Sequence, residues 1–250
     1  MYIALTHSTN TLMREQYLDR EDLFSLYTFH QTAGRGQAGN SWESEAGKNL
    51  LFSTLLQSPA VAPAQQFRLN MAISLAVTDI LPTEVCIKWP NDIYAGDRKL
   101  CGILIETLLS GATIRHAIAG VGLNVNQTEW KSDAPNPISL KQLTGKDYDL
   151  HLLMGQAQEA IASRMVMLRE EPNELRREYM ARLYRREGWH PYVLRDVSIA
   201  PSMPVMGEQQ QGMLMAQFED IDEQGQLVLR HEDGSVHAYH FKQIRFVIPR

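Results

Sequence analysis

The chain has 250 residues, of which 44% are hydrophobic and 21% charged, and its formal net charge is −5. This composition is typical of a soluble globular protein with one sizeable core, or with a main domain and a small one. No apolar run is long enough to span a bilayer, no signal peptide is recognisable, and no basic field points to nucleic acid, so we expect a cytoplasmic protein.

The two cysteines and eight histidines form no metal-binding pattern. Cys86 and Cys101 lie far apart, each in an apolar segment of β type, so buried free thiols are favoured over a disulfide, which stays open. There is no HxxxH or CxxC spacing. We therefore expect no zinc site and no metal bound directly by protein side chains.

The first half of the chain predicts alternating helices and strands. Ser8 and Thr9 are typical helix caps before a helix-compatible stretch. In chain order we expect a helix over 10–18, strands over 23–30 and 50–56, a long helix over 63–81, a strand over 85–89, a hairpin of 93–94 with 99–105, and a strand over 114–121. This order predicts helices packed on a sheet.

The second half begins with a polar, proline-bearing stretch at 127–137, which predicts a mobile loop. Helices are expected over 139–143, ended by Gly145, and over 150–168 and 172–184, the last with an arginine-rich solvated face. Short segments of β type follow at 192–194, 203–205, 213–221, 226–229, 236–241 and 245–247. We therefore expect an α+β protein with a mixed β-sheet flanked by helices in a domain of residues 1–190, and a small β-barrel domain of residues 191–250.

Two segments carry the strongest functional signal. Residues 31–50 read QTAGRGQAGNSWESEAGKNL, with four glycines around Arg35 and Trp42. Glycine lets a backbone approach a ligand closely, and successive exposed N–H groups attract anions. Residues 88–92 read KWPND, which holds Lys88 and Asp92 close together on a strand end and a turn. Either segment alone is often a plain loop or turn, but the combination is much harder to explain that way.

Three further segments complete a family pattern. Residues 99–106 read KLCGILIE, residues 120–124 read GVGLN, and Ser-Thr-Asn stands at 8–10. In order and spacing these segments resemble the biotin protein ligases, whose pattern is GRGRxGRxW, KWPND, K.AGIL.E and GAGIN. The resemblance covers essentially the whole chain. It implies a fold like that of class II aminoacyl-tRNA synthetases and biotin ligases, with an SH3-like C-terminal domain. Because the Ser-Thr-Asn segment begins at residue 8, we expect the monofunctional form without an N-terminal DNA-binding domain.

The chemistry that the resemblance implies needs positive charge. A carboxylic acid must first attack the α-phosphate of ATP, which brings two anions together. Arg35, Lys88 and Lys99 could supply the cations, and Mg²⁺ would neutralise the departing pyrophosphate. A target lysine then attacks the acyl-adenylate, and Asp92 is the candidate to position that amine and accept its proton. Because water must be kept out, we expect the 31–49 loop, and with it 127–137, to close over the intermediate.

The resemblance also implies site residues and partners. The biotin site would comprise Ser8, Thr9, Asn10, Gln31, Gly34, Arg35, Gly36, Gln37, Lys99 and Gly102. The nucleotide site would comprise Arg35, Trp42, Lys88, Asn91, Lys99 and Asn124. Biotin and ATP would be the substrates, with Mg²⁺, and the partner would be the biotin carboxyl carrier domain of a carboxylase, with no role for nucleic acid or membrane. A monomer and a homodimer both stay open.

The chain departs from the family pattern at two positions. Gln37 replaces an arginine that would lie beside the adenylate, and Asn40 stands where arginine is also frequent. The first change predicts weaker retention of the intermediate. A lipoate or octanoate ligase or transferase is the related alternative, against which KWPND speaks, and a noncatalytic biotin- or nucleotide-sensing module is the other. Trp42 as a loop anchor is as well supported as Trp42 as a nucleotide stacker.

Overall fold

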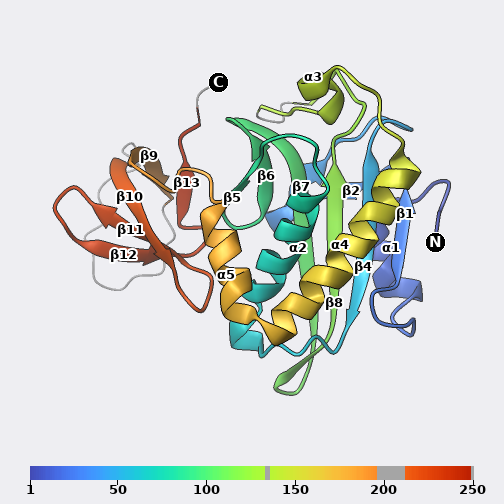
Figure 1. Cartoon of the computed structure of the whole chain (residues 1–250), viewed down its shortest axis with the longest axis horizontal. Coiled ribbons are helices and arrows are strands. Elements are labelled where there is room, and N and C mark those ends of the chain that lie inside the picture. Colours follow the sequence, from blue (N-terminus) through green and yellow to red (C-terminus); the bar gives the residue numbers. More distant parts are fainter. Residues whose placement is uncertain (133–135, 196–211, 249–250) are drawn as a thin grey trace.

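The computed structural model describes residues 1–132, 136–195 and 212–248. The strand expected over 203–205 lies outside these residues. The secondary structure elsewhere follows the predicted order closely, and Figure 1 shows a larger α+β part beside a smaller sheet formed by the C-terminal part of the chain. No helix of the described residues is long and apolar enough to cross a membrane.

The larger part is built on a six-stranded sheet. Its strands lie in the order β1 (Ser25–Thr28), β4 (Leu50–Gln57), β8 (Thr113–Leu123), β7 (Arg98–Ser110), β6 (Asp92–Ala95) and β5 (Cys86–Lys88). All neighbouring strands pair antiparallel. The expected mixed sheet is therefore wrong for these strands, because tight turns join β5 to β8 in succession and force antiparallel pairing. Parallel pairing in the described residues is confined to isolated bridges such as Thr6–Gln31.

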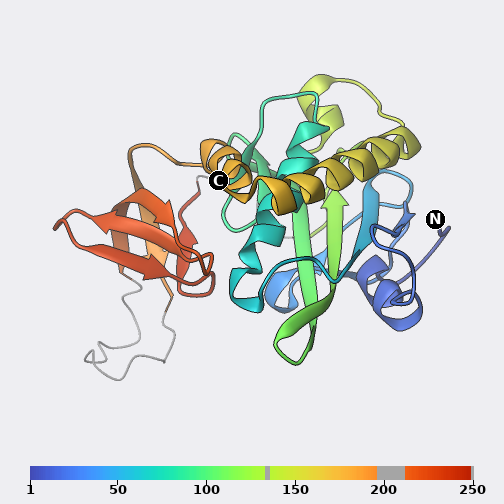
Figure 2. The ribbon, with the colours of Figure 1, turned by 60° about the horizontal axis from the view of Figure 1, so that its bottom comes forward.

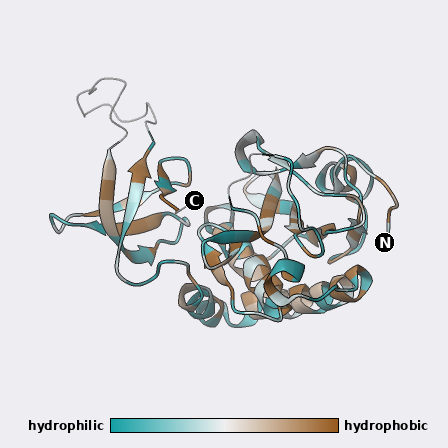
Figure 3. Ribbon diagram, turned by 90° about the horizontal axis from the view of Figure 1, so that it is seen from above, coloured by the Kyte–Doolittle hydropathy of each residue, from teal (hydrophilic) through white to brown (hydrophobic). Residues whose placement is uncertain are grey.

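Helices cover the two faces of this sheet unequally. Figures 1 and 2 show α2 (Phe67–Asp79), α4 (Leu150–Glu170) and α5 (Pro172–Ala181) on one face, where α2 is buried along most of its length. In Figure 3 apolar and polar stretches alternate along these helices, as expected for helices with one buried face. On the other face α1 (Thr9–Gln16) packs Met13 against Leu26, Leu55 and Ile118. The rest of that face is left for a ligand site.

Local sequence signals explain several element ends. Ser8 caps α1, because its hydroxyl accepts a hydrogen bond from the Thr11 N–H. Ser139 forms a capping box at the start of α3 (Leu140–Thr144), and Gly145 ends that helix in a left-handed conformation, as predicted. The 3₁₀ turn η2 (Pro63–Gln65) precedes α2. Cys86 and Cys101 are free thiols, as expected, although Cys86 is only partly buried.

The glycine-rich loop contains regular structure that the sequence did not predict. β2 (Gly34–Arg35) pairs antiparallel with β3 (Ser41–Trp42), and the 3₁₀ turn η1 (Gln37–Gly39) joins them. The Gly36 N–H donates to the Asn40 carbonyl at 2.7 Å, which closes the hairpin. The loop is thus a small hairpin that lies over the sheet.

The C-terminal part forms a second antiparallel sheet of five strands. Their order is β12 (Val236–Tyr239), β11 (Leu227–His231), β10 (Met213–Ile221), β9 (Trp189–Leu194) and β13 (Ile244–Phe246). Among the residues described, β12 and β13 end this order without pairing to each other, so a closed barrel stays a prediction. β9 begins at Trp189, which places the start of this sheet just before the predicted domain boundary.

Specific contacts join the second sheet to the first. The Trp89 Nε1–H donates to the Gly225 carbonyl at 2.9 Å. Arg176 on α5 forms an ion pair with Asp220 and donates to the Ile221 carbonyl.

Within the larger part, Arg182 donates to Asp79, the last residue of α2, at 2.8 Å. The expectation of a purely solvated arginine face is therefore wrong for Arg176 and Arg182, because both bind other elements.

Candidate active site

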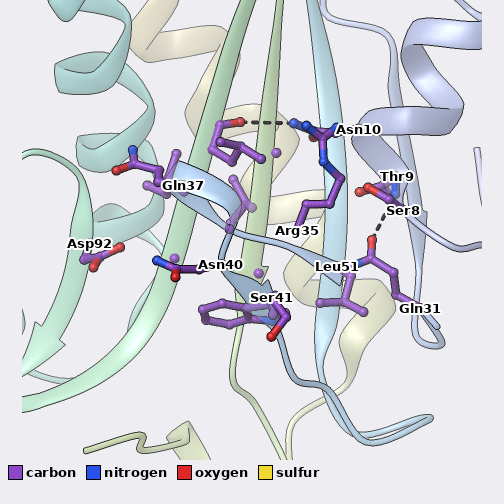
Figure 4. A pocket seen from close by; sticks show the side chains of 18 of the residues that line it. Ser8, Thr9, Asn10, Gln31, Arg35, Gln37, Asn40, Ser41, Leu51 and Asp92 are labelled. Atoms are coloured by element: carbon purple, nitrogen blue, oxygen red, sulfur yellow. Dashed lines mark hydrogen bonds between the residues drawn. The ribbon is translucent and has the colours of Figure 1, made fainter. Parts of the chain in front are cut away.

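A cavity lies on the sheet face that carries α1, between β4, β7 and β8 and the hairpin of the glycine-rich loop. Figure 4 shows Ser8, Thr9, Asn10 and Gln31 at one end, and Gln37 and Asp92 at the other. The lining residues are Ser8, Thr9, Asn10, Gln31, Arg35, Gly36, Gln37, Asn40, Ser41, Trp42, Leu51, Asp92, Lys99, Gly102, Ile103, Leu104, Gly120, Val121, Gly122 and Phe241. All predicted biotin-site residues except Gly34 belong to it. Gly34 instead lies within the hairpin as the cross-strand partner of Trp42, where a Cβ would lie 2.4 Å from the Trp42 carbonyl oxygen.

The end with Ser8 is a compact polar network. The Thr9 N–H donates to Gln31 Oε1 at 2.9 Å. Ser53 Oγ, which the sequence did not single out, lies 2.8 Å from Thr9 Oγ1 and 2.6 Å from Asn10 Oδ1. Gly120 is required beneath it, because a Cβ there would lie 2.0 Å from Asn10 Oδ1. This end can hold a small polar ring in a defined orientation.

The Arg35 guanidinium points away from the other predicted catalytic groups. Its Nη2 donates to Glu106 Oε1 at 3.0 Å, and its side chain lies beside Asn10, across the cavity from Asp92 (Figure 4). The structure therefore does not bring Arg35 together with Lys99 and Asp92. Glu106 belongs to the KLCGILIE segment, and its partners come from segments far away in sequence.

Trp42 lies flat on two glycines of the sheet. Gly102 on β7 and Gly122 on β8 are cross-strand partners, and a Cβ on either would lie 2.6 Å from the Trp42 ring. Lys99 Nζ stands 5.4 Å from the centre of the same ring. The buried Nε1 of Trp42 has no hydrogen-bond partner within the described residues. This position agrees with a loop anchor and leaves a buried donor for a ligand.

Lys99 and Asp92 form an ion pair in which Nζ lies 2.8 Å from Oδ2. The pairing of β6 with β7 sets this contact, because the β6–β7 hairpin brings the two strands side by side. Both side chains are about one quarter exposed, at 28% and 24%. A cation and a carboxylate are thus held at an accessible position. The KWPND segment predicted Lys88 beside Asp92, and the two residues are cross-strand partners, but the ion pair is formed by Lys99.

A second, larger cavity of about 720 Å³ adjoins the first one and lies between the two sheets. Asn40, Ser41, Trp42, Asp92 and Lys99 line both cavities. The other lining residues of the second cavity are Glu43, Lys88, Tyr94, Asn124, Trp130, Ser132, Asn136, Pro137, Arg195, Arg245, Phe246, Val247 and Ile248. Arg195 follows β9 and Arg245 lies on β13, so the C-terminal part contributes cations to this cavity.

Lys88 contributes a cation to this cavity. Its Nζ lies 4.8 Å from the centre of the Phe246 ring and 5.5 Å from that of Tyr94. Burial lowers the pKa of Lys88, and the Asp92 charge opposes that shift while nearby cations, including Arg195, add to it. A bound anion would favour the charged form. Lys88 lines only the second cavity.

Asn91 and Asn124 take different positions. Asn91 is fully buried, accepts a hydrogen bond from Gln37 Nε2 at 3.1 Å and donates to Asn70 Oδ1 at 2.6 Å. It lines neither cavity and supports the glycine-loop hairpin instead. Asn124 lines the second cavity, donates to the Ile138 carbonyl at 3.0 Å, and has a buried Oδ1 with no partner in the described part of the chain.

The two segments expected to close over the intermediate are connected to each other. Glu43 accepts hydrogen bonds from the Lys131 N–H at 2.7 Å and the Ser132 N–H at 2.9 Å. Gln127 Oε1 accepts from the Glu45 N–H and from Asn49 Nδ2.

No group of three or more His, Cys, Asp or Glu side chains that could hold a metal occurs in the described ranges.

Comparison with known proteins places this fold and site in a class. Residues 2–124 match the model of the biotin/lipoate A/B protein ligase family. A biotin–[acetyl-CoA-carboxylase] ligase of Mycobacterium tuberculosis is 31% identical over 189 residues, covering 72% of this chain and 69% of that protein. The bifunctional ligase/repressor BirA of Escherichia coli is 27% identical and covers 94% of this chain and 70% of its own length.

A solved structure shares the fold over the full length. The biotin protein ligase of Aquifex aeolicus in complex with biotin and ATP has a TM-score of 0.75 at 24% identity, covering 100% of this chain and 98% of that one. At that identity the likeness shows the fold alone. The chain belongs to the biotin protein ligase family.

Proposed function

We propose that this protein activates biotin with ATP to biotinyl-5′-AMP and then transfers biotin to a specific lysine of a biotin carboxyl carrier domain. The observation that carries the proposal is the Lys99–Asp92 pair at the junction of two cavities, one with a polar end for a small ring and one lined by cations. This arrangement supports a reaction between a carboxylate and a nucleotide phosphate. The names of the relatives agree with it.

In the first step biotin occupies the first cavity, with its ring at Ser8, Thr9, Asn10 and Gln31 and its carboxylate at Lys99. ATP occupies the second cavity, with its phosphates near Lys88, Arg195 and Arg245. A carboxylate oxygen attacks the α-phosphorus, an O–P bond forms, and pyrophosphate leaves. The cations lower the repulsion between the two anions. Mg²⁺, held by the phosphate oxygens of ATP, would neutralise part of the leaving-group charge.

In the second step the lysine amine of the carrier attacks the acyl carbon, and AMP leaves. Asp92 is the group that would orient this amine and accept its proton, because it already holds an ammonium group, that of Lys99, at 2.8 Å. The buried Trp42 Nε1–H and Asn124 Oδ1 are available to the intermediate as one donor and one acceptor. The Glu43 contacts support a joint closure of the 31–49 and 127–137 segments.

The carrier domain needs a place to dock beside this site. β6 pairs with β7 only as far as Cys101, whereas β8 pairs with β7 to Ser110. Within the described residues no strand pairs with the other edge of β7 after Cys101, so this edge can receive a strand of the carrier. We further propose that the second sheet is an SH3-like domain that contributes Arg195 and Arg245, and that the protein acts in the cytoplasm.

Acid-dependent exchange of labelled pyrophosphate into ATP tests the activation step. Biotin is expected to support exchange, and lipoate and octanoate are not. Lys99→Ala should reduce exchange by about a hundredfold or more. Arg115→Ala, which removes an exposed cation of β8 outside both cavities, is the control and should leave exchange intact. Exchange with lipoate instead of biotin would indicate the related ligase, and full turnover by Lys99→Ala would contradict the proposed site.

Incubation with labelled biotin, ATP and a carrier domain tests the transfer step. Label is expected on a single carrier lysine. Tight binding of biotin and nucleotide without exchange or transfer would indicate a noncatalytic sensor.

A further inference from the structure

Glu106 on β7 joins three side chains from two other segments at the ring end of the first cavity. Asn10 Nδ2 donates to its Oε2 at 3.0 Å, and Arg14 Nη2 donates to its Oε1 at 2.9 Å. Arg35 Nη2 donates to the same Oε1 at 3.0 Å. The Glu106 side chain is only 15% exposed. Helix α1, strand β2 and strand β7 therefore meet on one carboxylate.

This contact determines which way the Asn10 amide faces. Its Nδ2 donates to Glu106 and also to the Leu104 carbonyl at 3.2 Å. A carboxylate and a carbonyl only accept hydrogen bonds, so the NH₂ group must face them. Oδ1 then faces Ser53 Oγ at 2.6 Å and keeps a second lone pair. Asn10 therefore presents an acceptor to a ligand at this end.

Such an acceptor matches one chemical feature of the proposed substrate. The cyclic urea of biotin carries two N–H donors and one carbonyl acceptor. Asn10 Oδ1 can take an N–H, and the Thr9 hydroxyl can donate to the carbonyl. If the amide were reversed, Asn10 would present donors to a donor, which costs binding energy in a buried site.

The same carboxylate also holds the glycine-rich loop. Arg35 is the last residue of β2, and its guanidinium reaches Glu106 and, at 3.4 Å, Thr11 Oγ1 on α1. The backbone of Arg35 and Gly36 borders the cavity. Without the negative charge, Arg14 and Arg35 would face each other as like charges, and the hairpin would lose its attachment to the ring end.

We propose that Glu106 is a positioning residue for recognition of the urea ring, acting through Asn10 and Arg35. This proposal rests on the proposed function and deepens it by naming the residue that sets the polarity of the ring site. Glu106 does not touch the reacting carboxylate or phosphate. Its loss should therefore change biotin binding and leave the chemical step intact.

Glu106→Gln is the most direct variant, because it keeps the shape and removes the charge, and its own amide can pair with a reversed Asn10. Calorimetry should show a biotin dissociation constant raised about tenfold. The KM for biotin in pyrophosphate exchange should rise by the same factor, with kcat and the KM for ATP unchanged. The dissociation constant of desthiobiotin, which keeps the urea and lacks the sulfur, should rise by the same factor in this variant. Glu106→Asp, which keeps the charge on a shorter side chain, serves if the first variant does not fold.

Arg14→Gln is the matched control, because it removes a cation from the same carboxylate but lies outside the cavity. It should bind biotin as the wild type does. An unchanged biotin dissociation constant in the Glu106 variant, an equal loss in Arg14→Gln, or a loss confined to kcat would each overturn the proposal. Biotin binding by calorimetry needs no turnover. Wild-type protein that binds biotin but supports no exchange would therefore count against the proposed function and not against the role of Glu106.

Discussion

Lys88 is a residue at which stability and activity should oppose each other. Burial lowers its pKa, so the charged form is disfavoured in the folded state. The cost of burying the charge is present below the lowered folded pKa and disappears above the ordinary value of 10.5. The free energy of unfolding of the wild type should therefore increase as pH rises between these two values. Lys88→Met removes the cost.

Urea denaturation of Lys88→Met at pH 7 should therefore show an increase of about 1 kcal/mol in the free energy of unfolding. The KM for ATP should rise about tenfold, because a phosphate loses its cation. Arg115→Met, at an exposed position of β8 outside both cavities, should change neither quantity. A Lys88 variant that is both less stable and fully active would contradict this account.

Gln37 is the residue at which this chain departs most clearly from its family. Its side chain donates to Asn91 at 3.1 Å and lines the first cavity, but it carries no charge. Gln37→Arg should slow the spontaneous release of biotinyl-adenylate by about tenfold, because charge-assisted contacts are stronger. Gln37→Glu reverses the added charge and should speed release. Filter assays of enzyme-bound labelled adenylate measure both rates, and equal rates in all three proteins would exclude position 37 as a determinant of retention.

At this scale the sequence identified residues that stand inside compact motifs. Lys99 and Asp92 were both singled out, but KWPND predicted Lys88 as the neighbour of Asp92, and the ion pair with Lys99 appears only once β6 pairs with β7. Ser8 and Gln31, which the resemblance assigns to one site, line the same cavity, and their role in binding biotin stays a prediction. Ser53 and Glu106 could not be recognised, because their partners come from segments up to about a hundred residues away. The direction of the Arg35 side chain could not be predicted for the same reason, because it is set by a hydrogen bond to Glu106.

At the scale of elements, the contact between Glu43 and the backbone of Lys131 and Ser132 should respond to pH. Burial alone raises the pKa of Glu43, but hydrogen bonds from Ser132 and Lys131 outweigh burial and lower it below its usual 4.5. The contact is therefore fully present above pH 4.5 and is lost as pH falls through the lowered folded pKa. The amide resonances of Lys131 and Ser132 should shift together in that acidic range.

Glu43→Gln should speed hydrogen exchange at these two amides at pH 7 by about tenfold, because a charged acceptor is lost. Glu45→Gln is the control, since Glu45 contributes its backbone N–H and not its carboxylate. Exchange rates that stay the same in Glu43→Gln would show that the two segments are held together by other contacts.

Elements were predicted best where the signal is local. Caps at Ser8 and Ser139 and the stop at Gly145 depend on a few adjacent residues, and those boundaries agree with the structure to within a few positions. The order of strands in the sheet depends on which segments meet after collapse, and local patterns do not encode it. The hairpin inside the glycine-rich loop was missed because two-residue strands leave no periodic pattern.

For the whole molecule, one turn of the second sheet packs tightly against helix α2 of the larger part. Gly225 has φ +83°, and a Cβ there would lie 2.3 Å from the Phe67 ring. Gly234 in another turn of the same sheet has φ +86° and open space around it. Alanine at either position incurs a left-handed strain of about 1 kcal/mol. Gly225→Ala must also displace Phe67 or the turn, which should add about 2 kcal/mol.

Urea denaturation should therefore rank Gly225→Ala below Gly234→Ala and both below wild type. Gly225→Ala should also raise the KM for ATP, because the same turn accepts the Trp89 hydrogen bond and orients the sheet that carries Arg195 and Arg245. Gly234→Ala should keep the wild-type KM. Equal stabilities of the two variants would mean that the contact between Gly225 and Phe67 does not stabilise the packing of the second sheet against α2.

Asn40, Ser41, Trp42, Asp92 and Lys99 form a wall common to both cavities. A single compound can therefore fill both spaces at once, if an uncleavable acyl-sulfamate bridge replaces the reactive anhydride. Each half then raises the local concentration of the other to roughly the millimolar range. The linked compound should therefore bind much more tightly than either fragment alone. Most of that gain should come from linking the two fragments and little from additional contacts.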